Sequence, residues 1–418
     1  MKLKLGYGET YQTVEIPDAN LIGVMEPNEA DFKIRGIPAV DAALRYPIGT
    51  PLLSQIVKPG EKITIITSDI TRPVKSAEII PGILSELKSA GVSMGDVTVV
   101  FALGSHRGHT PAEMCKLVGD AVYDTVRCVD SDPDDCVNMG TTSFNTPVDV
   151  TRLVAEADRR IAVGNIEYHY FAGYSGGAKA IMPGVSTRNA IQSNHSRMVL
   201  PEAAAGVLEG NPVREDIEEA VSKFCPLDFI VNVVLDEHKE IICVVAGHPV
   251  KAHREGCRFL DSIYRKELLE KADIVIASQG GAPKDINLYQ VQKALDNAKH
   301  AVKYGGIIIL VGSCKEGLGE KVFEEWMTKS QTADSMIEHI QRDFRLGGHK
   351  AAAIAMVLKI CDIYLVSDIE PEFVRKIFLK PFASVQGALD AAFDKMGKNA
   401  SVLAMPHAGS TLPVRVQA

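Results

Sequence analysis

Short apolar runs alternate with longer amphipathic stretches over most of the chain, and this alternation is the strongest constraint on the fold. Six apolar runs have the length and composition of buried strands, at residues 62–66, 97–102, 160–166, 273–277, 306–311 and 402–405. The helix-like stretches lie at residues 77–90, 112–118, 212–224, 249–268, 331–342 and 384–395. Strands that are apolar on both faces need helices on both sides of their sheet. The pattern therefore predicts an α/β protein with mainly parallel sheets flanked by helices.

The first 30 residues have a different pattern, with short β segments (KLKLGYG, QTVEI and LIGVM) separated by turn residues. They predict a short antiparallel β piece at the N-terminus. A chain of 418 residues is long enough for two domains. We place the boundary near residue 270, where a long helical stretch meets a new strand. The predicted domains are residues 1–270 and 271–397, and a tail of residues 398–418 is free to return to the first domain.

Composition narrows the functional class. The formal net charge is −8, which argues against a general nucleic-acid-binding protein, because such proteins need a basic face. The sequence shows neither an apolar signal segment nor an apolar stretch of bilayer length, so we expect a cytoplasmic protein without a membrane partner. Eight cysteines without a CxxC pair predict neither a disulfide framework nor a structural zinc site.

Polar clusters follow several of the predicted strands. They are SDITRP at 68–73, GSHRGHT at 104–110, EYHYFAGYSGGAK at 167–179, SQGGAPKDINLYQVQK at 278–293 and GSCKEGLG at 312–319. In open α/β sheets, ligands bind beyond the carboxyl ends of the strands. We therefore predict that these loops line one active site in a cleft between the two domains, where closure excludes water.

Lys179 lies on a glycine-rich turn between His169 and His195. Gly176 and Gly177 permit positive φ and a close approach to a ligand, and the amides of such a turn can hold an anion. Two interpretations are open: a lysine beside a bound cofactor, or a surface turn with a solvated lysine. His195 has no partner at a metal-ligand spacing, so a metal bound there needs further donors, which a cofactor can supply.

Two further groups of residues are candidates for acid–base and anion-binding roles. Arg72, on the turn with Asp69 and Thr71, can bind a carboxylate or phosphate through two parallel hydrogen bonds; an Asp–Arg pair that closes the turn is the alternative. His106 and His169 follow different strands, and two neutral imidazoles facing one substrate would accept and donate protons near neutral pH.

In the second domain, Tyr289, Gln290 and Lys293 start a predicted helix, with Tyr289 and Lys293 on one face. Gln290 and Lys293 are candidates for binding a substrate carboxylate. A solvated helix start is the alternative interpretation.

The ordered set SDITRP, GSHRG, EYHYFAGYSGGAKAIMPG, His195 and GGAPKDINLYQVQK resembles the nickel-dependent lactate racemase family, which includes other 2-hydroxyacid racemases and epimerases. The resemblance covers most of the chain from about residue 60. It implies a nickel-pincer nucleotide, a pyridinium-3,5-bisthiocarboxylic acid mononucleotide, attached to a lysine and holding nickel through sulfur, carbon, sulfur and one histidine. It also implies partner enzymes that make this cofactor.

Matching positions carry the family roles onto this chain. The resemblance implies that Lys179 bears the cofactor, that His195 binds nickel, and that His106 and His169 form the acid–base pair. The implied cofactor contacts are Asp69, Ile70, Thr71, Arg72, Ser175, Gly176 and Gly177, and the implied substrate contacts are Arg72, Tyr289, Gln290 and Lys293. The implied reaction is inversion at C2 of a 2-hydroxyacid by proton-coupled hydride transfer through a bound 2-keto acid.

Alternatives from other classes remain open at the level of the sequence. One is a carboxylate- or phosphate-binding protein without catalysis, and another is a nicotinamide-dependent 2-hydroxyacid dehydrogenase, although no GxGxxG follows a strand. Position 168 is Tyr where the resemblance leads us to expect Pro, and the 2-hydroxyacid itself is left open between malate, an aryl lactate, a sugar acid and a short aliphatic acid.

Overall fold

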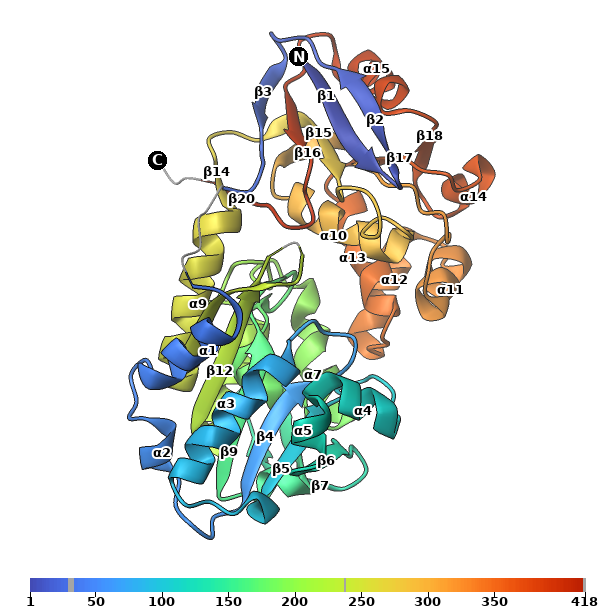
Figure 1. Ribbon diagram of the computed structural model, residues 1–418. Coiled ribbons are helices and arrows are strands. Elements are labelled where there is room, and N and C mark those ends of the chain that lie inside the picture. Colours follow the sequence, from blue (N-terminus) through green and yellow to red (C-terminus); the bar gives the residue numbers. More distant parts are fainter. Residues whose placement is uncertain (29–33, 237, 416–418) are drawn as a thin grey trace. The chain divides into compact units, whose positions relative to one another are not determined.

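The computed structural model describes residues 1–28, 34–236 and 238–415, which form two compact units (Figure 1). The middle unit contains residues 34–236 and 238–261. The terminal unit contains residues 1–28 together with residues 262–415. This division differs from the predicted domains 1–270 and 271–397, because both ends of the chain belong to the terminal unit and the break falls at Ser262.

The middle unit is built on a six-stranded sheet in the order β13-β12-β9-β4-β5-β6. All neighbouring pairs are parallel except β12 with β13. The strands are β4 (Ile63–Ser68), β5 (Val97–Ala102), β6 (Arg127–Asp130), β9 (Arg159–Asn165), β12 (Phe229–Leu235) and β13 (Ile241–Gly247). Two antiparallel hairpins lie outside this sheet, β7 (Cys136–Thr141) with β8 (Pro147–Thr151) and β10 (Tyr168–His169) with β11 (Gly173–Tyr174).

One face of this sheet packs against helices near the start of the unit. Alternate strand residues such as Ile63, Ile65, Val97 and Val99 join apolar side chains of α1 (Gly36–Arg45) and α3 (Ser76–Ser89) in one buried cluster. The other helices of the unit are α2 (Leu53–Ile56), α4 (Pro111–Val118), α5 (Asp120–Tyr123), α6 (Arg152–Ala155), α7 (Arg188–His195), α8 (Pro212–Glu219) and most of α9 (Pro249–Tyr264).

The terminal unit contains a fully parallel six-stranded sheet in the order β18-β17-β16-β15-β19-β3. Its strands are β3 (Leu21–Val24), β15 (Ala272–Ser278), β16 (Val302–Val311), β17 (Asp362–Val366), β18 (Lys380–Phe382) and β19 (Val402–Met405). Its helices are α10 (Leu288–Ala298), α11 (Lys321–Lys329), α12 (Ala333–Arg342), α13 (Gly348–Leu358), α14 (Pro371–Lys376) and α15 (Val385–Met396). The two sheets, one parallel except for β12 with β13 and one fully parallel, and their helices confirm the predicted α/β class.

The N-terminal segment lies in the terminal unit because its strands pair and pack there. The predicted antiparallel piece is the hairpin of β1 (Lys2–Tyr7) and β2 (Thr10–Glu15). Apolar residues of this hairpin share a buried cluster with α15 and the sheet. The third predicted segment, LIGVM, is not part of the antiparallel piece, since β3 extends the parallel sheet by pairing with β19.

The C-terminal tail also lies in the terminal unit. β19 is an inner strand of its sheet, between β15 and β3. The predicted helix at 249–268 is too long, because α9 ends at Tyr264 and β14 (Arg265–Leu268) pairs in parallel with β20 (Leu412–Arg415). None of the helices in the described ranges combines the length and apolar character needed to cross a membrane.

Candidate active site

Asp69 organises the turn that follows β4. Its buried carboxylate, 3% exposed, accepts hydrogen bonds from His106 Nδ1 and from Thr71 Oγ1, the latter at 2.8 Å. Burial alone would raise the pKa of Asp69, but the hydrogen bond and charge of His106, the Thr71 hydroxyl and the charge of Arg72 outweigh it and hold the pKa below its usual value. The structure thus brings together Asp69, Thr71 and His106, three of the residues that the sequence singled out.

The contact with Asp69 decides how His106 can act. An ionised carboxylate only accepts, so Nδ1 of His106 carries a hydrogen and Nε2 carries the lone pair of the neutral ring. A histidine held this way by a carboxylate is suited to accept a proton at Nε2 while the carboxylate stabilises the resulting positive charge.

His109 supports the same turn and was not assigned a role from the sequence. Its Nδ1 donates to Asp130 at 2.6 Å, and its Nε2 accepts the Ile70 N–H at 3.0 Å. His109 therefore holds the backbone between Asp69 and Thr71. The only sequence signal was the second histidine of GSHRGHT.

The glycine-rich turn that carries Lys179 is anchored by two residues that the sequence did not single out. Asn232 Oδ1 accepts the Gly177 N–H at 2.8 Å, and His253 Nε2 donates to the Ser175 carbonyl at 2.8 Å. Gly176 and Gly177 have φ of +74° and +58°. A Cβ would lie 2.7 Å from Asn232 Oδ1 at the first position and 2.9 Å from His253 at the second. These glycines are therefore required by conformation and by packing.

Phe171 brings the lysine and two histidines together. Its ring lies edge-on to His169 at 4.5 Å and to His195 at 4.9 Å between centroids, and Lys179 Nζ lies 5.8 Å from its centre. The three candidate residues that come from the β10–β11 hairpin, the following turn and α7 thus surround one aromatic side chain. The sequence marked these three residues as candidates, but it gave no sign of the role of Phe171.

The surroundings of Lys179 and His169 disfavour positive charge. Burial, followed by the charges of Arg214 and Arg72, places the pKa of Lys179 well below its usual value. Burial, followed by the charges of Lys179 and Arg72, does the same to the pKa of His169. The protonated forms of both side chains are thus disfavoured, in a site with a positive field that suits an anionic ligand.

Arg214 contributes part of this positive field. The helical stretch NPVRED, in which it lies, gave no indication in the sequence that this arginine belongs to the site. It lies in α8 and is 0% exposed. Its guanidinium donates to the Ala172 carbonyl at 3.1 Å and to the Tyr174 carbonyl, which ties the β10–β11 hairpin to the helix. Its Nη1 has no hydrogen-bond partner within the described residues.

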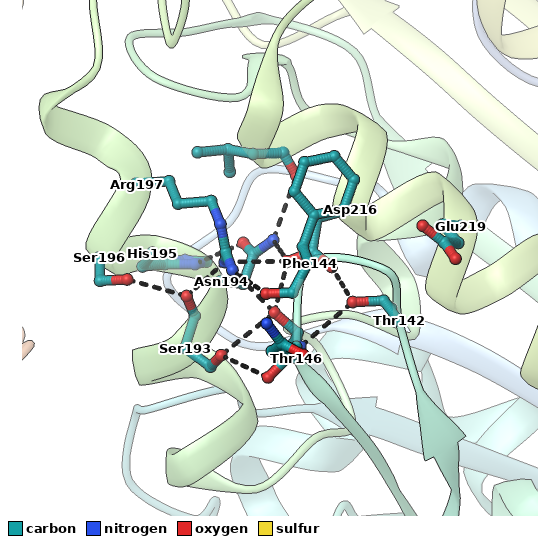
Figure 2. Close-up of polar contacts among 12 residues, drawn as sticks. Thr142, Phe144, Thr146, Ser193, Asn194, His195, Ser196, Arg197, Asp216 and Glu219 are labelled. Atoms are coloured by element: carbon teal, nitrogen blue, oxygen red, sulfur yellow. Dashed lines mark hydrogen bonds and ion pairs between the residues drawn. The ribbon is translucent and has the colours of Figure 1, made fainter.

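His195 is the last residue of α7 and is 6% exposed. Its Nδ1 is 2.9 Å from Asn194 Oδ1, within the polar network shown in Figure 2. Within the described ranges, no group of three or more His, Cys, Asp or Glu side chains is arranged to hold a metal. His195 offers one imidazole donor to a metal ion.

The substrate-binding candidates of the terminal unit start α10, as predicted. Asn287 caps this helix by accepting the Gln290 N–H at 3.0 Å, and Lys293 is exposed one turn further on. The amine of Lys350 donates to the Tyr289 carbonyl and lies 4.0 Å from the centre of the Tyr289 ring. Lys350, which was not among the candidates from the sequence, thus contacts Tyr289 of the predicted cluster.

Comparisons with known proteins point to one family. The sequence-family model of the lactate racemase N-terminal domain matches residues 7–206 of this chain. The family model of the lactate racemase C-terminal domain matches residues 268–412. The lactate racemase of Thermoanaerobacterium thermosaccharolyticum is 33% identical, and that of Lactiplantibacillus plantarum is 30% identical; the alignments cover 98% and 97% of both chains, respectively.

Solved structures are also similar to this chain. The lactate racemase apoprotein from T. thermosaccharolyticum superposes with a TM-score of 0.88 at 33% identity, covering 99% of this chain and 100% of the other. A protein from Thermotoga maritima shares the fold, with a TM-score of 0.63 at 18% identity, over 90% of this chain and 97% of the other.

Proposed function

Because this chain belongs to the lactate racemase family, we propose that it inverts the configuration at C2 of a 2-hydroxycarboxylic acid through a bound 2-keto acid. Family membership confirms the prediction of an isomerase of racemase type. It favours this function over the anion-binding protein and the nicotinamide-dependent dehydrogenase. Lactate, the substrate in the names of the relatives, is the first acid to test.

The residues around Phe171 fit a lysine-tethered anionic cofactor. An unprotonated Lys179 is the form of the amine that can be acylated, and the charges of Arg72 and Arg214 suit a nucleotide phosphate or carboxylate. His195 offers one imidazole where the described residues hold no metal cluster of their own, which agrees with a metal whose remaining donors belong to the cofactor.

In this proposal, Lys179 bears a nickel-pincer nucleotide and His195 binds its nickel ion. The further residues proposed to contact the cofactor are Asp69, Ile70, Thr71, Arg72, Ser175, Gly176 and Gly177. When bound, this group supplies the hydride-accepting chemistry at C2. The protein side chains then have two tasks, to move the hydroxyl proton and to hold the carboxylate.

His106 and His169 are proposed to move the hydroxyl proton. Nε2 of His106 accepts it for one enantiomer, with Asp69 stabilising the imidazolium that forms. His169 is proposed to serve the other enantiomer. Its Nδ1 accepts the Ala172 N–H at 3.3 Å in this structure, and this contact has to give way so that one ring nitrogen takes the proton while the other carries the hydrogen of the neutral ring. In that direction His106 enters as the imidazolium beside Asp69 and donates its Nε2 proton to the reformed hydroxyl after the keto acid has turned over. The reverse direction starts from the exchanged protonation states, so that one proton leaves the substrate and one returns each time.

Arg72, Tyr289, Gln290 and Lys293 are proposed to bind the substrate. A guanidinium and an ammonium that hold the carboxylate during the turnover of the keto acid would keep it from escaping. With the carboxylate held in place, the keto acid can turn over only by rotation of its C2 carbonyl group relative to the carboxylate.

The observation that carries the proposal is the convergence of His169, Lys179 and His195 around Phe171. The decisive experiment is the intact mass, with peptide mapping, of protein co-expressed with cofactor-making enzymes. We expect a nucleotide-sized adduct on Lys179, its loss in Lys179→Ala, and its retention in Lys223→Ala, which removes an exposed lysine of the same unit. Absence of an adduct, while the same enzymes load a known racemase, contradicts the proposal.

A further inference from the structure

The side-chain amide of Asn194 has a single possible orientation. This residue is 0% exposed, and its Nδ2 donates to the Val213 carbonyl at 3.1 Å and to Asp216 Oδ2 at 2.8 Å. A flipped amide would place its oxygen against these two acceptors, and both hydrogen bonds would be lost. The Oδ1 atom of Asn194 is therefore the atom that faces His195.

This orientation determines the tautomer of His195. Oδ1 of an amide can only accept, so the 2.9 Å contact requires that Nδ1 of His195 donates. In the neutral ring, Nε2 then carries the lone pair. Histidines that bind metals through Nε2 commonly donate their other ring hydrogen to a fixed acceptor, which sets both the tautomer and the direction of the ring.

Asp216 holds Asn194 in place. Its carboxylate is 0% exposed, and besides Asn194 it accepts from Thr142 Oγ1 at 2.6 Å and from Thr146 Oγ1 at 2.7 Å. The guanidinium of Arg197 lies 3.3 Å from Oδ2 and compensates the charge. Figure 2 shows these donors converging on the carboxylate from the β7–β8 hairpin, from α7 and from the residues just after it. A buried carboxylate with this many donors is a rigid anchor.

We propose that Asn194 and Asp216 are positioning residues that hold His195 as an Nδ1–H tautomer and thereby present Nε2 as a nickel ligand. This inference rests on the proposed function, in which His195 binds the nickel of the cofactor. Asn194 acts on His195 directly, and Asp216 acts through Asn194.

The first test reads the tautomer in the cofactor-free protein. Two-bond ¹H–¹⁵N correlation spectra of ¹⁵N-histidine-labelled full-length protein distinguish the two ring tautomers, and His195→Gln identifies the signal. We expect the Nδ1–H tautomer in the parent and its loss as the preferred form in Asn194→Leu, which keeps the volume but removes the acceptor. An Nε2–H tautomer in the parent, or an unchanged tautomer in Asn194→Leu, overturns the proposal.

The second test reads nickel retention in protein that carries the cofactor. Nickel loss to a chelator should become about 10- to 100-fold faster in Asn194→Leu and in Asp216→Asn, with the Lys179 adduct per chain unchanged. The matched control is Ser143→Ala, which removes a surface hydrogen bond to Glu219 beside Thr142 and should behave as the parent. Loss within twofold of the parent in Asn194→Leu overturns the proposal, and unfolding midpoints separate a folding defect from a local one.

His195→Ala distinguishes this inference from the proposed function. Unchanged nickel retention in His195→Ala removes His195 as a ligand, and the proposed metal assignment fails. Rapid loss in His195→Ala together with normal retention in Asn194→Leu leaves the ligand in place and rejects only the positioning role.

Discussion

Lys179 and His169 share a physical constraint, since each is a base in surroundings that disfavour its charged form. In the unfolded chain both bind a proton at their ordinary pKa. The folded state therefore binds fewer protons below that pKa, and its stability falls as the pH falls, until the folded pKa is reached. Because the fold disfavours the protonated forms of Lys179 and His169, both residues reduce stability as the pH falls below their ordinary pKa values.

His300 allows this linkage to be measured away from the site. Burial, helped by the charges of Lys299 and Lys271, lowers its pKa to about 3. The free energy of unfolding should fall from about pH 6.5 down to about pH 3, by up to about 1.4 kcal/mol for each pH unit. His300→Gln should remove this contribution. The fluorescence of Trp326, the single tryptophan and a residue of the same unit, would follow urea unfolding at pH 7, 6 and 5.

The control for this measurement is His238→Gln, which changes an exposed histidine. It should keep the pH dependence of the parent. An equal pH slope in His300→Gln and the parent would show that the folded protein protonates His300 at its ordinary pKa.

At the scale of the elements, the β10–β11 hairpin depends on contacts with its surroundings. Its two-residue strands are too short to be stable alone, and it is held by Arg214 in α8 and by Asn211, whose Nδ2 donates to the Phe171 carbonyl at 3.0 Å. Gly173 pairs with His169 in this hairpin and has φ of +74°. The position of a proposed catalytic histidine therefore depends on one glycine.

Gly173→Ala and Gly210→Ala form a matched pair for this dependence. Gly210 has nearly the same φ, +73°, but an added Cβ meets nothing within 4 Å, whereas at Gly173 it would lie 2.1 Å from the Val207 carbonyl oxygen. Both variants should lose about 1–2 kcal/mol for the left-handed conformation. Gly173→Ala should lose about 1–3 kcal/mol more through forced backbone shifts, with a larger fall in racemase activity.

Urea unfolding followed by circular dichroism, together with the rate of loss of optical purity, measures both effects. Equal stability and equal activity of the two variants would show that the hairpin adapts, and that Gly173 does not control His169.

At the scale of the whole molecule, the two ends of the chain build one unit and the segment between them builds the other. Leu5, Val14 and Ile16 of the N-terminal segment are at most 1% exposed in the core of the terminal unit. Burial of three aliphatic side chains contributes about 5–9 kcal/mol. This amount is comparable to the total stability of a domain, about 5–15 kcal/mol. We therefore expect that the terminal unit needs residues 1–28 to fold.

Fragments test this dependence. Residues 262–418 alone should show no cooperative transition in Trp326 fluorescence, and fusion of residues 1–28 through a short glycine linker should restore it. Such a linker is feasible because Asn28 Nδ2 donates to the Ser262 carbonyl at 2.7 Å. Residues 34–261 should unfold cooperatively without any addition, by circular dichroism. A cooperative transition of the unfused fragment at the same midpoint would mean that the N-terminal segment contributes little.

Part of the candidate site could be predicted because its residues lie close together in short sequence motifs. Asp69 and Thr71 share one turn, and Lys179 follows the glycines of another, so local motifs were sufficient to select them. Arg214, Asn232 and His253 could not be selected in this way. Their roles arise from contacts over 40 to 78 positions, and the helices and strand that carry them have ordinary patterns.

The sequence alone determined those features of the protein that depend on residues close together in the chain. The period of the apolar residues, the turn glycines and the polar clusters after the strands determined the α/β class, the six predicted strands, and the residues with which the chemistry is proposed to occur. Only the tertiary structure decided the sheet partners, the return of both chain ends to one unit, the lowered pKa of Lys179 and the tautomer of His195. These depend on pairing, burial and hydrogen bonds between residues far apart in the chain, which a local pattern does not encode.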